Sequence, residues 1–262
     1  MTLHRRDFVK LGSATALLSA LGFRATSANA PTIGLIFPPL NYPLPPDATR
    51  LFPSGVNFVS NGLGFAGMTI DSYNEAIPRA LPRAKELADM GADLISVFGS
   101  SITFYKGAAF NKELTDKVTA LTGKPATTQS NGLVDGLRHV NAKRIAVATA
   151  YTDVVTERLK VFLTEHGFDV VATKGLGYER IPEGAATQEI LLKLGVESYK
   201  TAGKADALVM SCGGLRTLDI IVPLEKAIGV PVVSSTPHGL WHCARMLKVP
   251  SKIDGFGMVM AA

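Results

Sequence analysis

The stretch Ala205-Asp206-Ala207-Leu208-Val209-Met210-Ser211-Cys212-Gly213 resembles an earlier stretch of the same chain, Ala92-Asp93-Leu94-Ile95-Ser96-Val97-Phe98-Gly99-Ser100. Both are apolar runs of strand length that end in small residues, a pattern typical of strands buried on both faces of a parallel sheet. Residues 123–128 match residues 229–234, and residues 33–37 match residues 145–149. Because the three pairs occur in the same order, we predict two similar α/β halves that face each other across a cleft. A chance likeness between generic buried strands is the alternative.

Runs rich in β-branched residues alternate with longer segments of helical periodicity, which predicts parallel sheets covered by helices. The predicted strands are Thr32–Phe37, Leu94–Phe98, Ile145–Ala148, Val170–Ala172, Ala207–Ser211 and Val232–Ser234. The predicted helices are Arg83–Met90, Asn111–Leu121, Gly132–Val140, Val154–His166, Gln188–Thr201, Leu218–Ile228 and Pro237–Leu247. Pro78 and Pro82 predict a late start or a kink in the first helix, because proline is poor inside a helix. The predicted fold class is α/β, with two parallel-sheet halves in a pseudo-twofold arrangement and the active site in the cleft between them.

The first thirty residues have the layout of a secretory leader. A basic segment, Arg5-Arg6-Asp7-Phe8-Val9-Lys10, precedes an apolar run from Leu11 to Phe23, and Ala28-Asn29-Ala30 is a small-x-small cleavage site. The paired arginines are typical of a twin-arginine signal, which the twin-arginine export machinery would recognise. The apolar run is shorter than the roughly 20 residues that span a bilayer. We therefore expect residues 1–30 to be a cleaved signal peptide, although an uncleaved anchor or a chance basic terminus would also fit.

The remaining chain, residues 31–262, is predicted to be one catalytic α/β domain that is periplasmic or otherwise exported and has no stable membrane span after cleavage. The full chain of 262 residues is 47% hydrophobic and 19% charged, an ordinary globular balance. Its net charge is +5, but the leader supplies +3 of this (Arg5, Arg6, Lys10 and Arg24 against Asp7), which leaves +2. With no basic stripe that contains interleaved aromatic residues, we expect no nucleic-acid partner.

Ligands of open parallel sheets bind at the carboxyl ends of the strands. The segments that follow four predicted strands are Pro38-Pro39, Gly99-Ser100-Ser101, Ala150-Tyr151 and Cys212-Gly213-Gly214. In the internal match Gly99 takes the place of Cys212, so one half offers a thiol and the other offers no side chain. This asymmetry predicts that Cys212 is the centre of the chemistry.

Most free cysteines are buried and inert, so Cys212 needs further support. Gly213 and Gly214 allow backbone N–H groups to approach a ligand closely. A thiol with its usual pKa of about 8.5 can deliver a proton to carbon near neutral pH. Ser100, Ser101 and Tyr151, with the backbone N–H of Gly213, could bind a carboxylate or an enediolate. Serines that cap a helix and a tyrosine that completes the core are the alternatives.

The sequence contains no pattern that predicts a metal or an organic cofactor. His238 and His242 have the i, i+4 spacing of a zinc pair, but no Glu lies between them in an HExxH arrangement, and we expect surface histidines. The glycine pattern in residues 62–67 lacks the strand–helix context of a dinucleotide site. The second cysteine, Cys243, is either free or paired with Cys212.

Several long segments make the chain resemble the arylmalonate decarboxylase family, within the aspartate/glutamate racemase superfamily. The likeness runs from Pro31 to about Lys248. Its segments are Pro31-Thr32-Ile33-Gly34, Pro38-Pro39, Ser101–Asn111, Ala148-Thr149-Ala150-Tyr151, Glu157-Arg158-Leu159, Ser211–Leu215, Thr217-Leu218-Asp219 and Gly229–Ser235.

The resemblance implies cofactor-free decarboxylation of an arylmalonate-type dicarboxylate. Cys212 would protonate the enediolate that remains after carbon dioxide leaves. The retained carboxylate would lie in a dioxyanion hole formed by Ser100, Ser101, Tyr151 and the Gly213 backbone. The walls of the site would be formed by Gly99, Pro38, Pro39, Phe65, Met68, Ile102 and Ile181.

The chain departs from the family pattern in ways that affect the substrate. Ser100 stands where the family has threonine, Phe65 and Met68 are bulkier than the aliphatic residues expected there, and Gly184 replaces a larger apolar residue. One thiol suits protonation from one face better than racemisation by two bases. A maleate-isomerase-like or racemase-like enzyme on an acidic substrate and an exported, non-enzymatic carboxylate-binding protein remain alternatives.

Overall fold

The computed structural model describes residues 30–262, so the predicted leader lies outside the described residues except for Ala30. The first half contains a four-stranded parallel sheet with the order β2-β1-β3-β4. Its strands are β1 (Thr32–Phe37), β2 (Asn57–Gly62), β3 (Leu94–Val97) and β4 (Ala126–Thr128).

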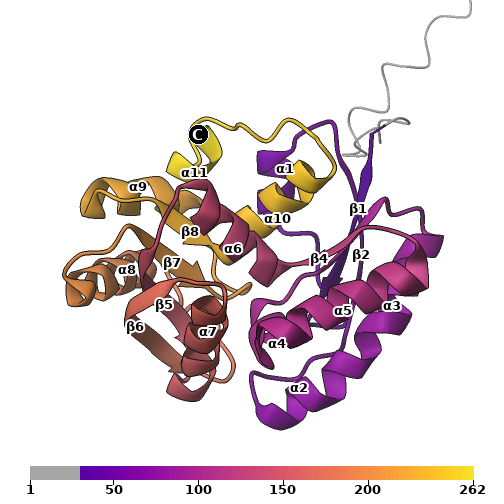
Figure 1. Ribbon diagram of the computed structural model, residues 1–262, viewed down its shortest axis with the longest axis horizontal. Coiled ribbons are helices and arrows are strands. Elements are labelled where there is room, and N and C mark those ends of the chain that lie inside the picture. Colours follow the sequence, from indigo (N-terminus) through magenta and orange to yellow (C-terminus); the bar gives the residue numbers. More distant parts are fainter. Residues whose placement is uncertain (1–29) are drawn as a thin grey trace, which may run out of the picture.

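The second half repeats this arrangement, with a parallel sheet in the order β6-β5-β7-β8. Its strands are β5 (Arg144–Tyr151), β6 (Asp169–Tyr178), β7 (Ala207–Ser211) and β8 (Val232–Ser234). The three pairs of matching sequence segments correspond to β1 and β5, β3 and β7, and β4 and β8. The predicted fold class is therefore confirmed, and Figure 1 shows the two halves side by side, the first in indigo to magenta and the second in orange to yellow.

The helices connect the parallel strands and cover the sheets (Figure 1). Those of the first half are α1 (Pro46–Leu51), α2 (Ile70–Ala76), α3 (Ala80–Asp89), α4 (Ser100–Phe104), α5 (Gly107–Thr122) and α6 (Gln129–His139). Those of the second half are α7 (Asp153–Glu165), α8 (Gln188–Ala202), α9 (Leu218–Ile228), α10 (Ser235–Met246) and α11 (Met258–Ala261). Among the described residues no helix is both long and apolar enough to cross a membrane.

Two prolines, Pro78 and Pro82, lie between the end of α2 and the first turn of α3. Helix α2 ends at Ala76, a 3-10 turn covers Ile77–Arg79, and α3 begins at Ala80. Pro78 lies in the turn, and Pro82 lies in the first turn of α3, where a missing N–H group breaks no hydrogen bond. The predicted late start is therefore wrong, because α3 begins at Ala80, before the predicted Arg83, and the interruption lies at the 3-10 turn that contains Pro78.

Glycine residues bring α6 and α10 into backbone contact between the two halves. A Cβ atom on Gly132 of α6 would lie only 2.7 Å from the Cα of Gly239 in α10. A Cβ on Gly239 would in turn lie 3.0 Å from the Phe98 ring. Larger residues at these two positions would therefore push the helices apart.

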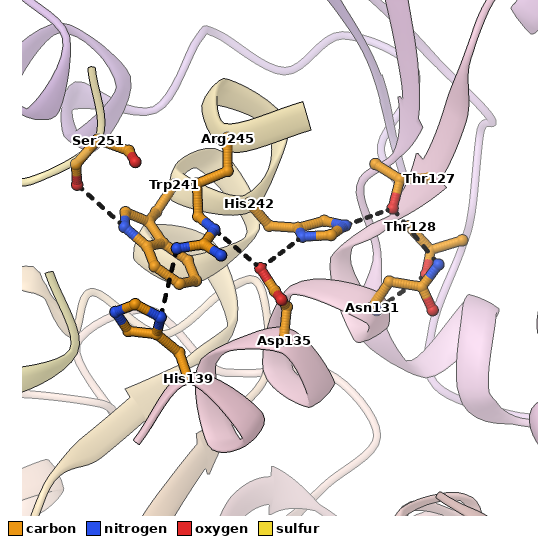
Figure 2. Close-up of polar contacts among 9 residues, drawn as sticks. All are labelled: Thr127, Thr128, Asn131, Asp135, His139, Trp241, His242, Arg245 and Ser251. Carbon is orange, nitrogen blue, oxygen red and sulfur yellow. Dashed lines mark hydrogen bonds and ion pairs between the residues drawn. The ribbon is translucent and has the colours of Figure 1, made fainter. Parts of the chain in front are cut away.

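Polar contacts extend the junction of α6 and α10 (Figure 2). His242 lies between Asp135 and Thr127, with its Nδ1 3.0 Å from Asp135 Oδ2 and its Nε2 2.9 Å from Thr127 Oγ1. Arg245 pairs with the same carboxylate at 3.4 Å and lies over the Trp241 ring at 4.5 Å. His242 therefore joins the two halves, and the prediction that it is a surface histidine is wrong.

His238 also departs from the prediction, because it is fully buried in α10. Its Nδ1 lies 2.9 Å from the backbone nitrogen and 3.1 Å from the carbonyl oxygen of Ser234, and its Nε2 has no hydrogen-bond partner among the described residues. Burial disfavours the charged imidazolium and lowers the pKa of His238 from 6.5 to about 4.

Acid should therefore destabilise the fold through His238. Between pH 6.5 and about 4 the unfolded chain binds a proton at this residue and the folded chain does not, so stability is lost as the pH falls. Urea unfolding at pH 8 and pH 4.5 should show a decrease of about 2–3 kcal/mol from this residue. The His238→Gln variant should lack that part of the decrease. Equal losses in the wild type and the variant would contradict the assignment.

Candidate active site

The carboxyl ends of both sheets open onto one cavity of about 330 Å³. The first half contributes the segments after β1, β2, β3 and β4, and the second half contributes those after β5, β6, β7 and β8. Eleven of the twelve predicted site residues line this cavity: Cys212, Ser100, Ser101, Tyr151, Gly213, Gly99, Pro38, Pro39, Phe65, Met68 and Ile181.

Cys212 follows β7 directly and is only 7% exposed. Its backbone N–H donates to Ser235 Oγ at 3.2 Å, which fixes the start of the Cys212-Gly213-Gly214 turn. Burial raises the pKa of the Cys212 thiol to about 11, although hydrogen bonds from the Gly214 backbone, the Tyr151 side chain and the Leu215 backbone partly oppose this. The thiol is therefore protonated at neutral pH, the form that a proton donor requires.

Hydroxyl groups from both halves form a continuous chain beside the thiol. Ser100 Oγ lies 2.8 Å from Ser235 Oγ, and Ser235 Oγ lies 3.4 Å from Ser211 Oγ. Ser211 Oγ is in turn 3.4 Å from the hydroxyl of Tyr151. Burial keeps the pKa of Tyr151 well above its usual value, so this phenol stays neutral and can donate to an anion. With Ser101, these groups form the hydroxyl cluster of the site.

Gly99 faces this site without a side chain, but the space beside it is not empty. A Cβ on Gly99 would lie 2.7 Å from Pro38 Cγ and 3.3 Å from Ile102 Cδ1. The Pro38 ring reaches this position because β1 and β3 are neighbours in the sheet. The glycine therefore makes room for a proline wall as well as removing a second thiol.

The remaining walls are apolar and come from loops of both halves. Phe65 and Met68 follow β2, and Ile181 follows β6. The backbone N–H of Met68 donates to Glu179 O at 2.8 Å, and the Arg180 guanidinium donates to Ala66 O at the same distance. These contacts hold the two loops together over one side of the cavity.

Ile102 is the predicted wall residue that does not line the cavity. It is fully buried in α4, where its Cδ1 lies 3.3 Å from the position that a Cβ on Gly99 would take. The family resemblance implied a lining role, but successive residues of a helix point in different directions. Ile102 therefore packs beside Gly99 without lining the cavity.

Sequence reasoning missed five polar residues of the cavity, Tyr42, Gln129, Glu179, Arg180 and Thr236. Gln129 is fully buried, and its Oε1 accepts hydrogen bonds from both the N–H and the hydroxyl of Ser100. Thr236 Oγ1 donates to Gly213 O at 3.2 Å. Gln129 comes after strand β4 and Thr236 comes after strand β8. These two short strands lie in the matching segments 123–128 and 229–234, and this internal match was the available indication that both residues are near the site.

The titratable groups of the described chain form no metal centre. Within residues 30–262, no group of three or more His, Cys, Asp or Glu side chains could hold a metal ion. Cys212 and Cys243 are both free thiols, so they are not paired with each other. Cys243 is fully buried in α10, and burial raises the pKa of its thiol to about 12.

Comparison with known proteins identifies the family of this chain. The model of the family described as arylmalonate decarboxylase matches residues 33–260. The chain belongs to this family. It is 40% identical to arylmalonate decarboxylase of Bordetella bronchiseptica over 220 residues, which cover 84% of this chain and 91% of that protein.

Solved structures of this family and of a more distant one share the fold. A liganded variant of arylmalonate decarboxylase, with one glycine replaced by cysteine and one cysteine by serine, has a TM-score of 0.84 and 38% identity over 88% of this chain and 98% of that one. A maleate cis-trans isomerase variant of Nocardia farcinica, with a covalently bound succinylcysteine intermediate, has a TM-score of 0.76 and 19% identity, and covers 88% of this chain and 98% of that one. At this identity the isomerase shows a common fold alone.

The protonated thiol gives a prediction for chemical modification. Since only the thiolate reacts, iodoacetamide should modify Cys212 slowly at pH 8, and the rate should rise about tenfold per pH unit until the pH nears 11. Mass spectrometry of the peptide that contains Cys212 measures this rate, and the buried Cys243 provides an internal comparison. A rate that levels off below pH 9 would contradict the raised pKa.

Proposed function

We propose that this protein removes carbon dioxide from an arylmalonate-type dicarboxylate without a cofactor and releases an arylacetic or 2-arylpropionic type of monoacid. The observation that carries the proposal is a buried, protonated thiol beside a two-sided hydroxyl cluster in one apolar cavity. Membership of the arylmalonate decarboxylase family gives independent support.

In the proposed reaction the bond between the α-carbon and one carboxylate breaks, and its electron pair stays on the substrate as an enediolate. Ser100, Ser101, Tyr151 and the Gly213 N–H stabilise the retained carboxylate as this charge develops. The Cys212 S–H bond then breaks and its proton goes to the α-carbon. Solvent returns a proton to the resulting thiolate, which completes the cycle.

The apolar walls act on the carboxylate that leaves. Burying a charged carboxylate against side chains such as Pro38, Phe65 and Ile181 costs several kcal/mol. Release as neutral carbon dioxide removes that cost, so the cavity favours bond cleavage. The aryl group of the substrate fits the same walls and helps to delocalise the carbanion.

Two observations favour a decarboxylase over an isomerase or a racemase. A covalent cysteine intermediate requires a thiolate, whereas burial keeps Cys212 protonated at neutral pH. Gly99 supplies no second catalytic thiol, and a Cβ at this position would lie 2.7 Å from the Pro38 ring. A carboxylate-binding protein without activity would need the hydroxyl cluster but would have no use for the thiol.

Incubation of the purified protein with phenylmalonate tests the function. The wild type should release carbon dioxide, and Cys212→Ser should lower kcat by about 10²-fold or more, because a positioned acid typically contributes that much. In deuterium oxide the product should carry one deuterium at the α-carbon. Phenylmalonate binding of equal affinity by both proteins, without carbon dioxide release, would favour the binding protein. Deuterium exchange into a monoacid without carbon loss would favour a racemase.

We also propose that the chain is exported through the twin-arginine pathway and acts in the periplasm. The support is the order of paired arginines, apolar run and small-x-small site in residues 1–30. In a bacterium with this pathway, the protein should appear in the periplasm with Pro31 at its N-terminus. Replacement of Arg5 and Arg6 by lysine should leave it in the cytoplasm at full length. Periplasmic protein from that variant would contradict the proposal.

A further inference from the structure

Gln129 is a buried amide in the cavity wall that has no part in the proposed reaction. It begins α6, directly after β4, and none of its surface is exposed. Its Oε1 accepts the backbone N–H of Ser100 at 2.9 Å and the hydroxyl of Ser100 at 2.8 Å. Because a backbone N–H can only donate, the atom that faces Ser100 must be the amide oxygen. This contact fixes the orientation of the whole amide group.

The amide nitrogen reaches the other half of the molecule. Gln129 Nε2 donates to Thr236 Oγ1 at 3.2 Å, and the hydroxyl of Thr236 donates to Gly213 O at 3.2 Å. A Cβ on Gly213 would lie 3.0 Å from Gln129 Oε1, so the amide packs directly against the turn that follows Cys212. One side chain therefore connects Ser100 in the first half with the thiol turn in the second half.

Ser235 forms the reciprocal connection from the second half. It begins α10 directly after β8, as Gln129 begins α6 directly after β4. Its Oγ lies 2.8 Å from Ser100 Oγ and accepts a hydrogen bond from the Cys212 N–H at 3.2 Å. Two bridges therefore run from Ser100 to the Cys212-Gly213 turn, one through Gln129 and one through Ser235. The bridge through Ser235 needs only a hydroxyl group. The bridge through Gln129 needs an acceptor and a donor on the same side chain.

We propose that Gln129 is a positioning residue that holds the hydroxyl cluster and the thiol turn at a fixed separation. The inference rests on the proposed decarboxylation. The enediolate must contact the hydroxyl groups of both halves while the Cys212 sulfur lies near its α-carbon. A displacement of about 1 Å in such an arrangement can reduce a rate by about 10²-fold. Gln129 does not itself contact the reacting atoms in this account.

The first test compares Gln129→Met with Asn131→Leu. Methionine keeps the length of the side chain but makes neither hydrogen bond to Ser100 nor the one to Thr236. On phenylmalonate, Gln129→Met should lower kcat by about 10- to 100-fold while KM changes by less than about threefold. Asn131→Leu removes an amide from the same helix that contacts Thr127 instead, and it should keep the wild-type kcat. A wild-type kcat in Gln129→Met would overturn the proposal.

The second test uses the conservative variant Gln129→Glu. A protonated carboxyl group has one acceptor and one donor, so it can replace the amide in both contacts. The ionised form cannot donate to Thr236 and places a negative charge beside the substrate. Activity of Gln129→Glu should therefore approach that of the wild type at acid pH and decrease as the pH rises, a dependence that the wild type lacks over the same range. Activity that is low and independent of pH would overturn the proposal.

Hydrogen exchange tests the bridge without a substrate. In Gln129→Met, backbone exchange should accelerate in both Gly99–Phe104 and Ser211–Leu215, whereas Asn131→Leu should exchange as the wild type does. Absence of carbon dioxide release by the wild type would refute the proposed function and leave this measurement to decide the role of Gln129. Unchanged exchange in either segment would show that the amide does not couple the two halves.

Discussion

The backbone contact between α6 and α10 is the constraint on which the site depends. Gly132 and Gly239 let the two helices approach more closely than any side chain would allow. Each helix begins directly after the last strand of its sheet, so this contact sets the relation between the carboxyl ends of β4 and β8. Gln129 and Ser235, the first residues of the two helices, consequently lie where each can reach across to the opposite half.

Burial then determines the chemistry that this arrangement supports. The same desolvation raises the pKa of Cys212, keeps Tyr151 neutral and makes a charged carboxylate costly against the apolar walls. A thiol in such a place is a proton donor, not a nucleophile. The first half has Gly99 at the position that Cys212 takes in the second half. The Pro38 ring lies next to Gly99, in the space that a side chain at this position would enter.

The strands of the two sheet centres could be predicted because they are buried on both faces. Strands β1, β3, β5 and β7 are apolar runs whose pattern does not depend on their surroundings. Strand β2 was missed because Asn57–Gly62 is a partly exposed edge strand that contains polar residues. Helices α1, α2 and α4 were missed because five to seven residues are too few to show a helical period.

The sequence alone determined the duplicated α/β halves, the thiol at Cys212 and the hydroxyl groups at neighbouring strand ends, because each depends on local patterns within a strand and the residues after it. Only the tertiary structure decided that Gln129 bridges the halves, that Pro38 fills the space beside Gly99 and that Ile102 does not line the cavity. The burial of His238 and the pairing of His242 with Asp135 were decided in the same way. These features depend on contacts between residues far apart in the chain, which neither hydrophobic periodicity nor motif spacing records.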